Sequence, residues 1–93
     1  MRDQYERYIK FCADKSMRGW TAKGTVIIHY SFFEPSRRRD KDNVAGYAMK
    51  LTQDALVKGG YLSGDGWQNI ENFDFRWEVD KHNPRIEVEI EEL

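Results

Sequence analysis

Apolar residues recur at helical spacing in two separate parts of the chain. The first set, spaced i, i+3, i+4 and i+7, consists of Tyr5, Tyr8, Ile9 and Cys12. It predicts a helix from about Asp3 to Ser16. The second set repeats along residues 44–56 and consists of Val44, Tyr47, Ala48, Leu51, Ala55 and Leu56. It predicts a helix that Asp42 or Asn43 can cap and that Gly59-Gly60 ends.

Three other segments have the composition of strands. Residues 25–33 are rich in β-branched and aromatic side chains, which predicts a strand buried on both faces. Residues 73–79 and 86–91 alternate apolar with charged side chains, which predicts two strands that each have one solvated face. Residues 80–84 are expected to join these two strands as a hairpin loop, and Pro84 fits the start of a strand or an edge.

These elements predict an α+β domain in the order α-β-α-β-β, with two helices packed on a three-stranded, largely antiparallel sheet. Ninety-three residues make one domain, residues 1–93. A domain of this size buries only about 60 to 65% of its unfolded surface, so dimerisation would add stability. The single Cys12 excludes an internal disulfide, and Cys12 and the two histidines lack the spacing of zinc ligands.

No apolar run reaches the length that a membrane span needs, and the first residues lack the apolar core of a signal peptide. We therefore expect a soluble, cytoplasmic protein without a membrane partner.

The net charge of −1 hides a strong division between the two halves of the chain. Residues 1–41 hold ten Lys and Arg against five Asp and Glu, whereas residues 42–93 hold five against eleven. A basic half can bind phosphates, while an acidic half repels them unless its carboxylates turn away or bind cations. Ordinary surface charge explains the division equally well at this point.

Three aspartates are candidates for a metal site. Asp40 and Asp42 are one residue apart, so their carboxylates can share a divalent cation, and Asp65 lies in a turn between Gly64 and Gly66 that is expected to expose it. Mg²⁺ binds few protein carboxylates, keeps waters and favours phosphodiester hydrolysis. On spacing alone, a solvated turn or a helix cap remains the commoner explanation of Asp40 and Asp42.

Basic residues surround the first two aspartates. Arg37, Arg38 and Arg39 precede them and Lys41 separates them, which favours contact with a phosphodiester over a calcium-buffer loop. Lys50 follows a little over two helical turns after Asp42, where it is either an ordinary exposed lysine or a group that stabilises charge on the reacting phosphate.

Taken together, these residues resemble the signature of the RusA-type Holliday junction resolvases. That signature is a basic run into Asp-x-Asp-Asn, a helix that carries a lysine and ends in Asp-Ala-Leu, then a glycine and a turn with a further aspartate. The matching parts are Arg37-Arg-Arg-Asp-Lys-Asp-Asn43, Lys50, Asp54-Ala-Leu56, Gly60 and Asp65. The resemblance extends from Val26 to the carboxyl end of the chain.

The resemblance implies a Mg²⁺-dependent endonuclease, with Mn²⁺ as a possible substitute, that resolves Holliday junctions in DNA recombination and repair. It implies a homodimer that binds four-way junctions or other branched DNA and nicks opposing strands symmetrically, without a small-molecule cofactor. Asp40, Asp42 and Asp65 correspond to the metal ligands, and Lys50 to the catalytic lysine. Arg37, Arg38, Arg39 and Lys41 are the expected DNA contacts. The family is common in prophages.

Three departures from the family pattern favour an alternative, a noncatalytic relative that binds branched DNA with an incomplete site. Counted forward from Asp42, the family lysine would fall on Gly46 rather than Lys50. Gly64 stands where many members have a second acid, beside Asp65. Larger members also begin with a strand ahead of the first helix. A plain protein-interaction domain would require the whole signature to be coincidental.

Overall fold

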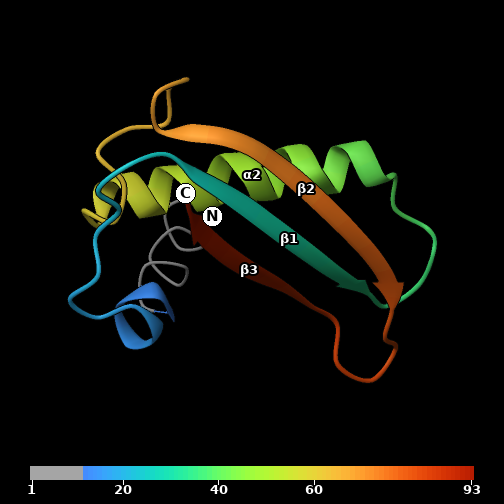
Figure 1. Ribbon diagram of the computed structural model, residues 1–93. Coiled ribbons are helices and arrows are strands. Elements are labelled where there is room, and N and C mark those ends of the chain that lie inside the picture. Colours follow the sequence, from blue (N-terminus) through green and yellow to red (C-terminus); the bar gives the residue numbers. More distant parts are fainter. Residues whose placement is uncertain (1–11) are drawn as a thin grey trace.

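The computed structural model describes residues 12–93, in which a helical turn at residues 12–16 precedes four longer elements (Figure 1). These are β1 (Val26–Glu34), α2 (Lys41–Lys58), β2 (Ile70–Val79) and β3 (Arg85–Glu92). The predicted α+β class and the order of the elements are confirmed. Residues 3–11 of the predicted first helix lie outside the described residues.

β1 is the central strand of a mixed sheet with the order β2-β1-β3. β2 pairs with β1 in parallel, with Val26 opposite Ile70, and β3 pairs with β1 antiparallel. The predicted hairpin between β2 and β3 is therefore wrong, because these strands lie on opposite edges of β1 (Figure 1). The sheet is mixed because α2 is a crossover that returns the chain in the direction of β1, which makes β1 and β2 parallel.

The core lies between α2 and one face of the sheet. The residues of β1 alternate in burial: Val26, Ile28, Tyr30 and Phe32 are at most 1% exposed, whereas those between them are only partly buried. The prediction that β1 is buried on both faces is wrong for the second face. That face carries charged groups from all three strands, including the imidazole of His29 between Asp74 and Glu91.

α2 begins at Lys41 with Asp40 as its N-cap, two or three residues before the predicted cap. It ends at Gly59 as predicted, and Gly60 follows with a φ of +84°, which glycine adopts without strain. Its buried residues are Val44, Ala48, Leu51, Thr52, Ala55 and Leu56. Tyr47 was predicted to belong to this stripe but is 53% exposed.

A single helix about 10 Å across is narrower than three strands and their side chains. Apolar side chains at the flanks of the covered face therefore stay partly exposed, and these are Phe75, Val79, Ile86 and Val88. Between residues 12 and 93, no helix has both the length and the apolar character needed to cross a bilayer.

Candidate nucleic-acid interface and metal centre

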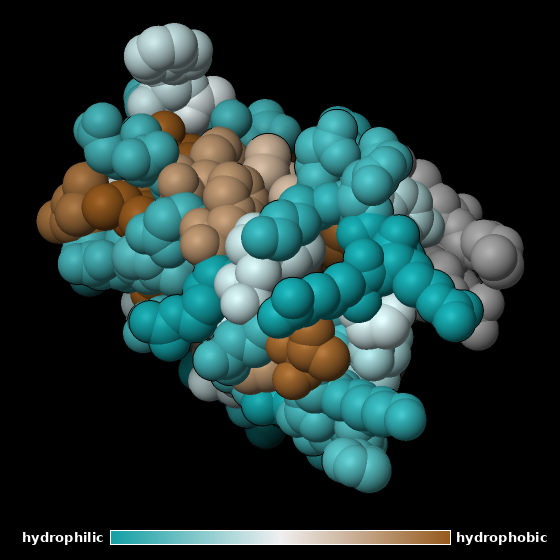
Figure 2. All heavy atoms as spheres, turned by 90° about the vertical axis from the view of Figure 1, so that its right-hand side faces the viewer, coloured by the Kyte–Doolittle hydropathy of each residue, from teal (hydrophilic) through white to brown (hydrophobic). Residues whose placement is uncertain are grey.

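The basic loop connects the end of β1 to the start of α2, at one end of the molecule (Figure 1). Pro35 ends the strand because it donates no hydrogen bond to a sheet, and six residues later the chain is helical. Figure 2 looks onto this end and shows hydrophilic side chains gathered across much of it. The loop is exposed, as a DNA contact requires.

The three arginines of the loop are not equivalent. Arg39 donates hydrogen bonds to both carboxylate oxygens of Glu34, from Nε at 2.9 Å and from a terminal guanidinium nitrogen at 2.8 Å. The hydrogen bonds to Glu34 raise the pKa of Arg39. Glu34 is only 8% exposed, so this pair ties the loop to the end of β1. Arg39 is therefore paired within the fold, whereas its predicted contact with DNA stays a prediction.

Arg37, Arg38 and Lys41 are the cations that remain at this end of α2. None of them has an ion-pair partner among residues 12–93, and all three are exposed. Lys41 lies with its Nζ 5.6 Å from the centre of the Trp77 ring, a cation–π contact. These positive charges are free to meet phosphates.

Asp40 is the N-cap of α2 and Asp42 lies in its first turn, where the helix dipole stabilises negative charge. The side chain of Asp40 makes no capping hydrogen bond, although the residue is the N-cap. Within the described part of the chain, neither carboxylate has an ion-pair partner, and both are exposed. Both carboxylates are thus available for a ligand.

Asp65 is exposed on a bend, as predicted. The bend is held by Asn69, whose side-chain amide donates to the Ser63 hydroxyl and whose side-chain oxygen accepts from the Gly66 amide. Neither Gly64 nor Gly66 has a positive φ. A Cβ at Gly64 would lie 2.9 Å from the Asn69 side-chain oxygen, so a larger residue there would displace the Asn69 side chain.

Within one chain, Asp65 does not meet Asp40 and Asp42. α2 has 18 residues and a length of about 27 Å, and Asp65 follows its far end. The amide of Val26, at the start of β1, donates to the carbonyl of Asn69, which fixes the turn at the end of the sheet opposite to the basic loop. No group of three potential metal ligands exists among residues 12–93.

Lys50 is also separate from the acidic pair. It stands about 12 Å along the helix from Asp42, and its Nζ lies 3.4 Å from a carboxylate oxygen of Asp54, an i, i+4 ion pair. Gly46, the alternative position for a lysine, is one turn after Asp42 and exposed, and nothing lies within 4 Å of a Cβ built there.

Asp40 and Asp42 are each the kind of ligand that Mg²⁺ prefers, although they stand two positions apart at the start of α2, where helix side chains do not face each other. This ion is commonly bound through one or two carboxylates together with substrate phosphates and waters, rather than in a cage made only of protein groups. The neighbouring cations Arg37 and Lys41 can bring a phosphate to the same place. Either carboxylate together with a bound phosphodiester would therefore supply the ligands that this ion takes from protein and substrate.

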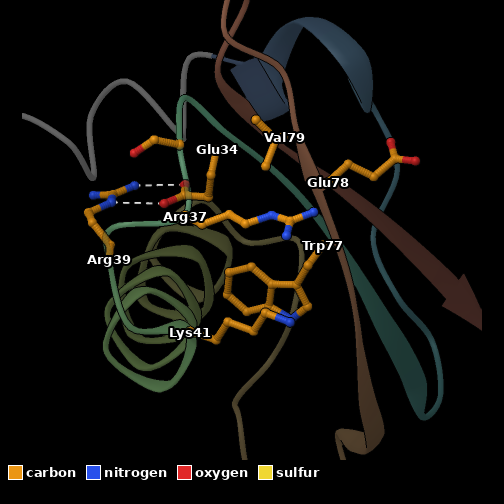
Figure 3. A pocket seen from close by; sticks show the side chains of 8 residues that line it. Glu34, Arg37, Arg39, Lys41, Trp77, Glu78 and Val79 are labelled. Atoms are coloured by element: carbon orange, nitrogen blue, oxygen red, sulfur yellow. Dashed lines mark hydrogen bonds and ion pairs between the residues drawn. The ribbon is translucent and has the colours of Figure 1, made fainter.

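Two further residues of this end were missed by the sequence reasoning. Trp77 stacks on Phe32, with ring centres 4.2 Å apart and planes at 14°, and its ring faces the basic loop (Figure 3). The sequence does contain a signal for Glu34, because this charged residue occupies the next buried position in the alternation of β1. Trp77 gave none, because its alternation with charged neighbours is that of any half-buried strand.

A scan against protein-family models finds no family that matches the chain, and a search of curated proteins finds no match.

Proposed function

We propose that the protein is a Mg²⁺-dependent endonuclease that binds branched DNA, including four-way junctions, as a homodimer and nicks it. The observation that carries this proposal is the pair Asp40 and Asp42 in the first turn of α2, next to Arg37, Arg38 and Lys41. Exposed carboxylates beside cations that lack ion-pair partners are what metal-assisted phosphodiester hydrolysis needs. A DNA substrate also agrees with a cytoplasmic protein.

Each group has a separate role in this proposal. Arg37 and Arg38 bind phosphates of the DNA backbone, and Lys41 binds a phosphate at the helix terminus. Asp40 and Asp42 hold Mg²⁺, which when bound neutralises charge on the phosphate and lowers the pKa of water. Arg39 holds the loop in place through Glu34 rather than contacting DNA. The catalytic role of Lys50 stays a prediction.

A second copy of the chain supplies the third carboxylate in this proposal. Asp65 lies at the far end of α2, so an antiparallel arrangement about a two-fold axis brings the Asp65 turn of each chain to the Asp40–Asp42 pair of the other. The basic loop and the acidic second half of the chain are complementary in charge. Trp67, two residues after Asp65, is 97% exposed, which is unusual for tryptophan in a monomer.

The two-fold axis also accounts for paired nicks. A symmetric dimer has two equivalent sites that face opposite strands of a four-way junction, and each site takes residues from both chains. Cleavage of both strands then follows from symmetry without a second kind of site.

The test is an assay on a synthetic four-way junction, with and without Mg²⁺, using Mn²⁺ as a second metal. We expect symmetric nicks only with metal, and we expect Asp42→Asn to abolish them while junction binding persists. Asp74→Asn is the matched control because Asp74 is an exposed acid of β2 that binds His29. No nicking by the unmodified protein with either metal would refute the enzyme proposal.

The DNA contact has its own test. Arg38→Ala is expected to weaken junction binding and to reduce the dependence of affinity on salt, since fewer counterions are released. Lys23→Ala, an exposed cation before the start of β1, is the control and should leave both quantities nearly unchanged. An unaltered salt dependence in Arg38→Ala would exclude that contact.

A second candidate is a noncatalytic protein that binds branched DNA. It is favoured by the distance of Asp65 and Lys50 from Asp42 within one chain, which leaves two carboxylates at the basic loop. Junction binding without nicks, at protein concentrations where the dimer forms, would select this candidate.

A further inference from the structure

A hollow of about 310 Å³ opens beside the basic loop (Figure 3). Three segments meet there: the end of β1 with the loop that follows, the first residue of α2, and the end of β2. Its lining residues are Glu34, Ser36, Arg37, Arg39, Lys41, Trp77, Glu78 and Val79.

The charges around the hollow leave it positive. Glu34 and Arg39 neutralise each other through their paired hydrogen bonds. Glu78 follows Trp77 in β2 and therefore faces the other side of the sheet, and Figure 3 shows its carboxylate directed away from the indole. Arg37 and Lys41 remain as the cations at the hollow.

Trp77 gives the hollow an aromatic wall of fixed orientation. Its ring stacks on Phe32, a core residue that is 0% exposed, so the indole cannot turn away without disturbing the core. Lys41 lies over the same ring, with its Nζ 5.6 Å from the ring centre, so its flexible side chain would move aside when a base stacks there. A rigid aromatic surface next to two cations is the arrangement with which proteins bind single-stranded nucleic acid, by stacking a base and pairing its phosphate.

We propose that this hollow binds one unpaired nucleotide of branched DNA, with its base against Trp77 and its phosphate at Arg37 and Lys41. A paired base cannot use the site, because both of its faces are covered by its neighbours in the duplex. Unstacking costs least where a base is already unpaired, as in a single-stranded arm or flap of branched DNA. The inference rests on the proposed function and deepens it by naming the part of the substrate that the protein selects.

The site also places the substrate for cleavage. Lys41 lies between Asp40 and Asp42 in the chain, with its Cα about 3.8 Å from each of theirs, so the hollow and the two carboxylates share one end of α2. Selection of an unpaired nucleotide therefore directs the nick to the phosphodiester beside it, and structure selectivity follows without any base sequence being read.

The test uses the unmodified protein and single-stranded oligonucleotides of about ten nucleotides. One carries a central 2-aminopurine, whose fluorescence falls when it stacks, and its partner carries an abasic site at the same position. We expect quenching, and about tenfold tighter binding of an oligonucleotide with the base than of the abasic one. Equal affinity for the two, or no binding of either, overturns the proposal.

Two variants locate the effect. Trp77→Leu should abolish the preference for the base, whereas Trp77→Phe should keep most of it because a ring remains, and thermal unfolding reports whether either variant stays folded. A preference that survives in folded Trp77→Leu places the base elsewhere and overturns the proposal. Nicking without a base preference would reject only this inference, whereas a base preference without nicking would reject only the enzymatic function.

Discussion

The guanidinium group of Arg39 binds both carboxylate oxygens of Glu34 and thereby joins the basic loop to the last residue of β1. The side chain of Glu34 is 11% exposed, while that of Arg39 is 63% exposed. The pair divides the arginine run into one residue that is tied to the end of β1 and two that make no ion pair within residues 12–93.

Arg39→Ala should therefore destabilise the protein, whereas Arg38→Ala should not. Removing Arg39 leaves a largely buried carboxylate without a partner, and we expect a loss of about 1–2 kcal/mol in the free energy of unfolding. Urea denaturation measures both variants. Equal stability of the two would contradict the structural role of Arg39.

The sequence predicted the elements well because their signals are local. The apolar repeat of α2 and its two glycines fixed the helix from its own residues, and the alternation in residues 73–79 fixed most of β2. The pairing of the strands was not predictable in this way. An alternation of apolar and charged residues is the same whichever strand lies beside it. The sequences of β2 and β3 therefore do not indicate that both pair with β1.

The residues of the candidate site also differ in how far the sequence predicts their positions. Asp40, Asp42 and the basic residues were predicted together because they are neighbours in sequence. Asp65 was predicted as a third carboxylate from its turn between two glycines, but its place at the far end of α2 depends on how the whole chain folds. The sequence also does not distinguish Arg39 from Arg37, because three adjacent arginines give no indication of which one pairs with Glu34.

A lysine at Gly46 should improve the site. Position 46 is one helical turn after Asp42 and open to solvent, and replacing glycine in an exposed helix interior gains about 1 kcal/mol. Gly46→Lys and Gly46→Ala should therefore both be more stable than the unmodified protein. In an assay of junction nicking with Mg²⁺, only Gly46→Lys should be faster. A gain shared by Gly46→Ala would contradict a role for the amine.

His29 should make stability dependent on pH. Hydrogen bonds to Glu91 and then to Asp74 raise its pKa above the usual 6.5, with N···O distances of 2.9 and 2.7 Å. The imidazolium is thus favoured in the folded state. Its stabilisation is complete below pH 6.5 and disappears as the pH rises through the raised pKa.

The measurement for His29 is urea denaturation of the unmodified protein and of His29→Gln at pH 6 and at about pH 9. The stability difference between the two should be larger at the lower pH. A difference that stays constant, or that grows with pH, would show that the two carboxylates do not hold a charged imidazole.

Trp67 should anchor the dimer. It is 97% exposed on the same turn as Asp65, and buried tryptophans are among the strongest contributors to protein interfaces. Trp67→Ser is expected to weaken dimerisation at least tenfold in sedimentation equilibrium, and Trp67→Phe should weaken it less because an aromatic ring remains. Unchanged association of Trp67→Ser would place the interface elsewhere.

The most direct measurement of the shared site mixes two inactive variants, Asp42→Asn and Asp65→Asn. In a mixed dimer, one site receives both substitutions and the other receives an intact Asp42 and an intact Asp65. Random assortment should then restore about a quarter of the nicking sites on a four-way junction, whereas each variant alone has none. Subunit exchange is verified by differently tagged chains. No nicking by verified mixed dimers would contradict a site built from two copies of the chain.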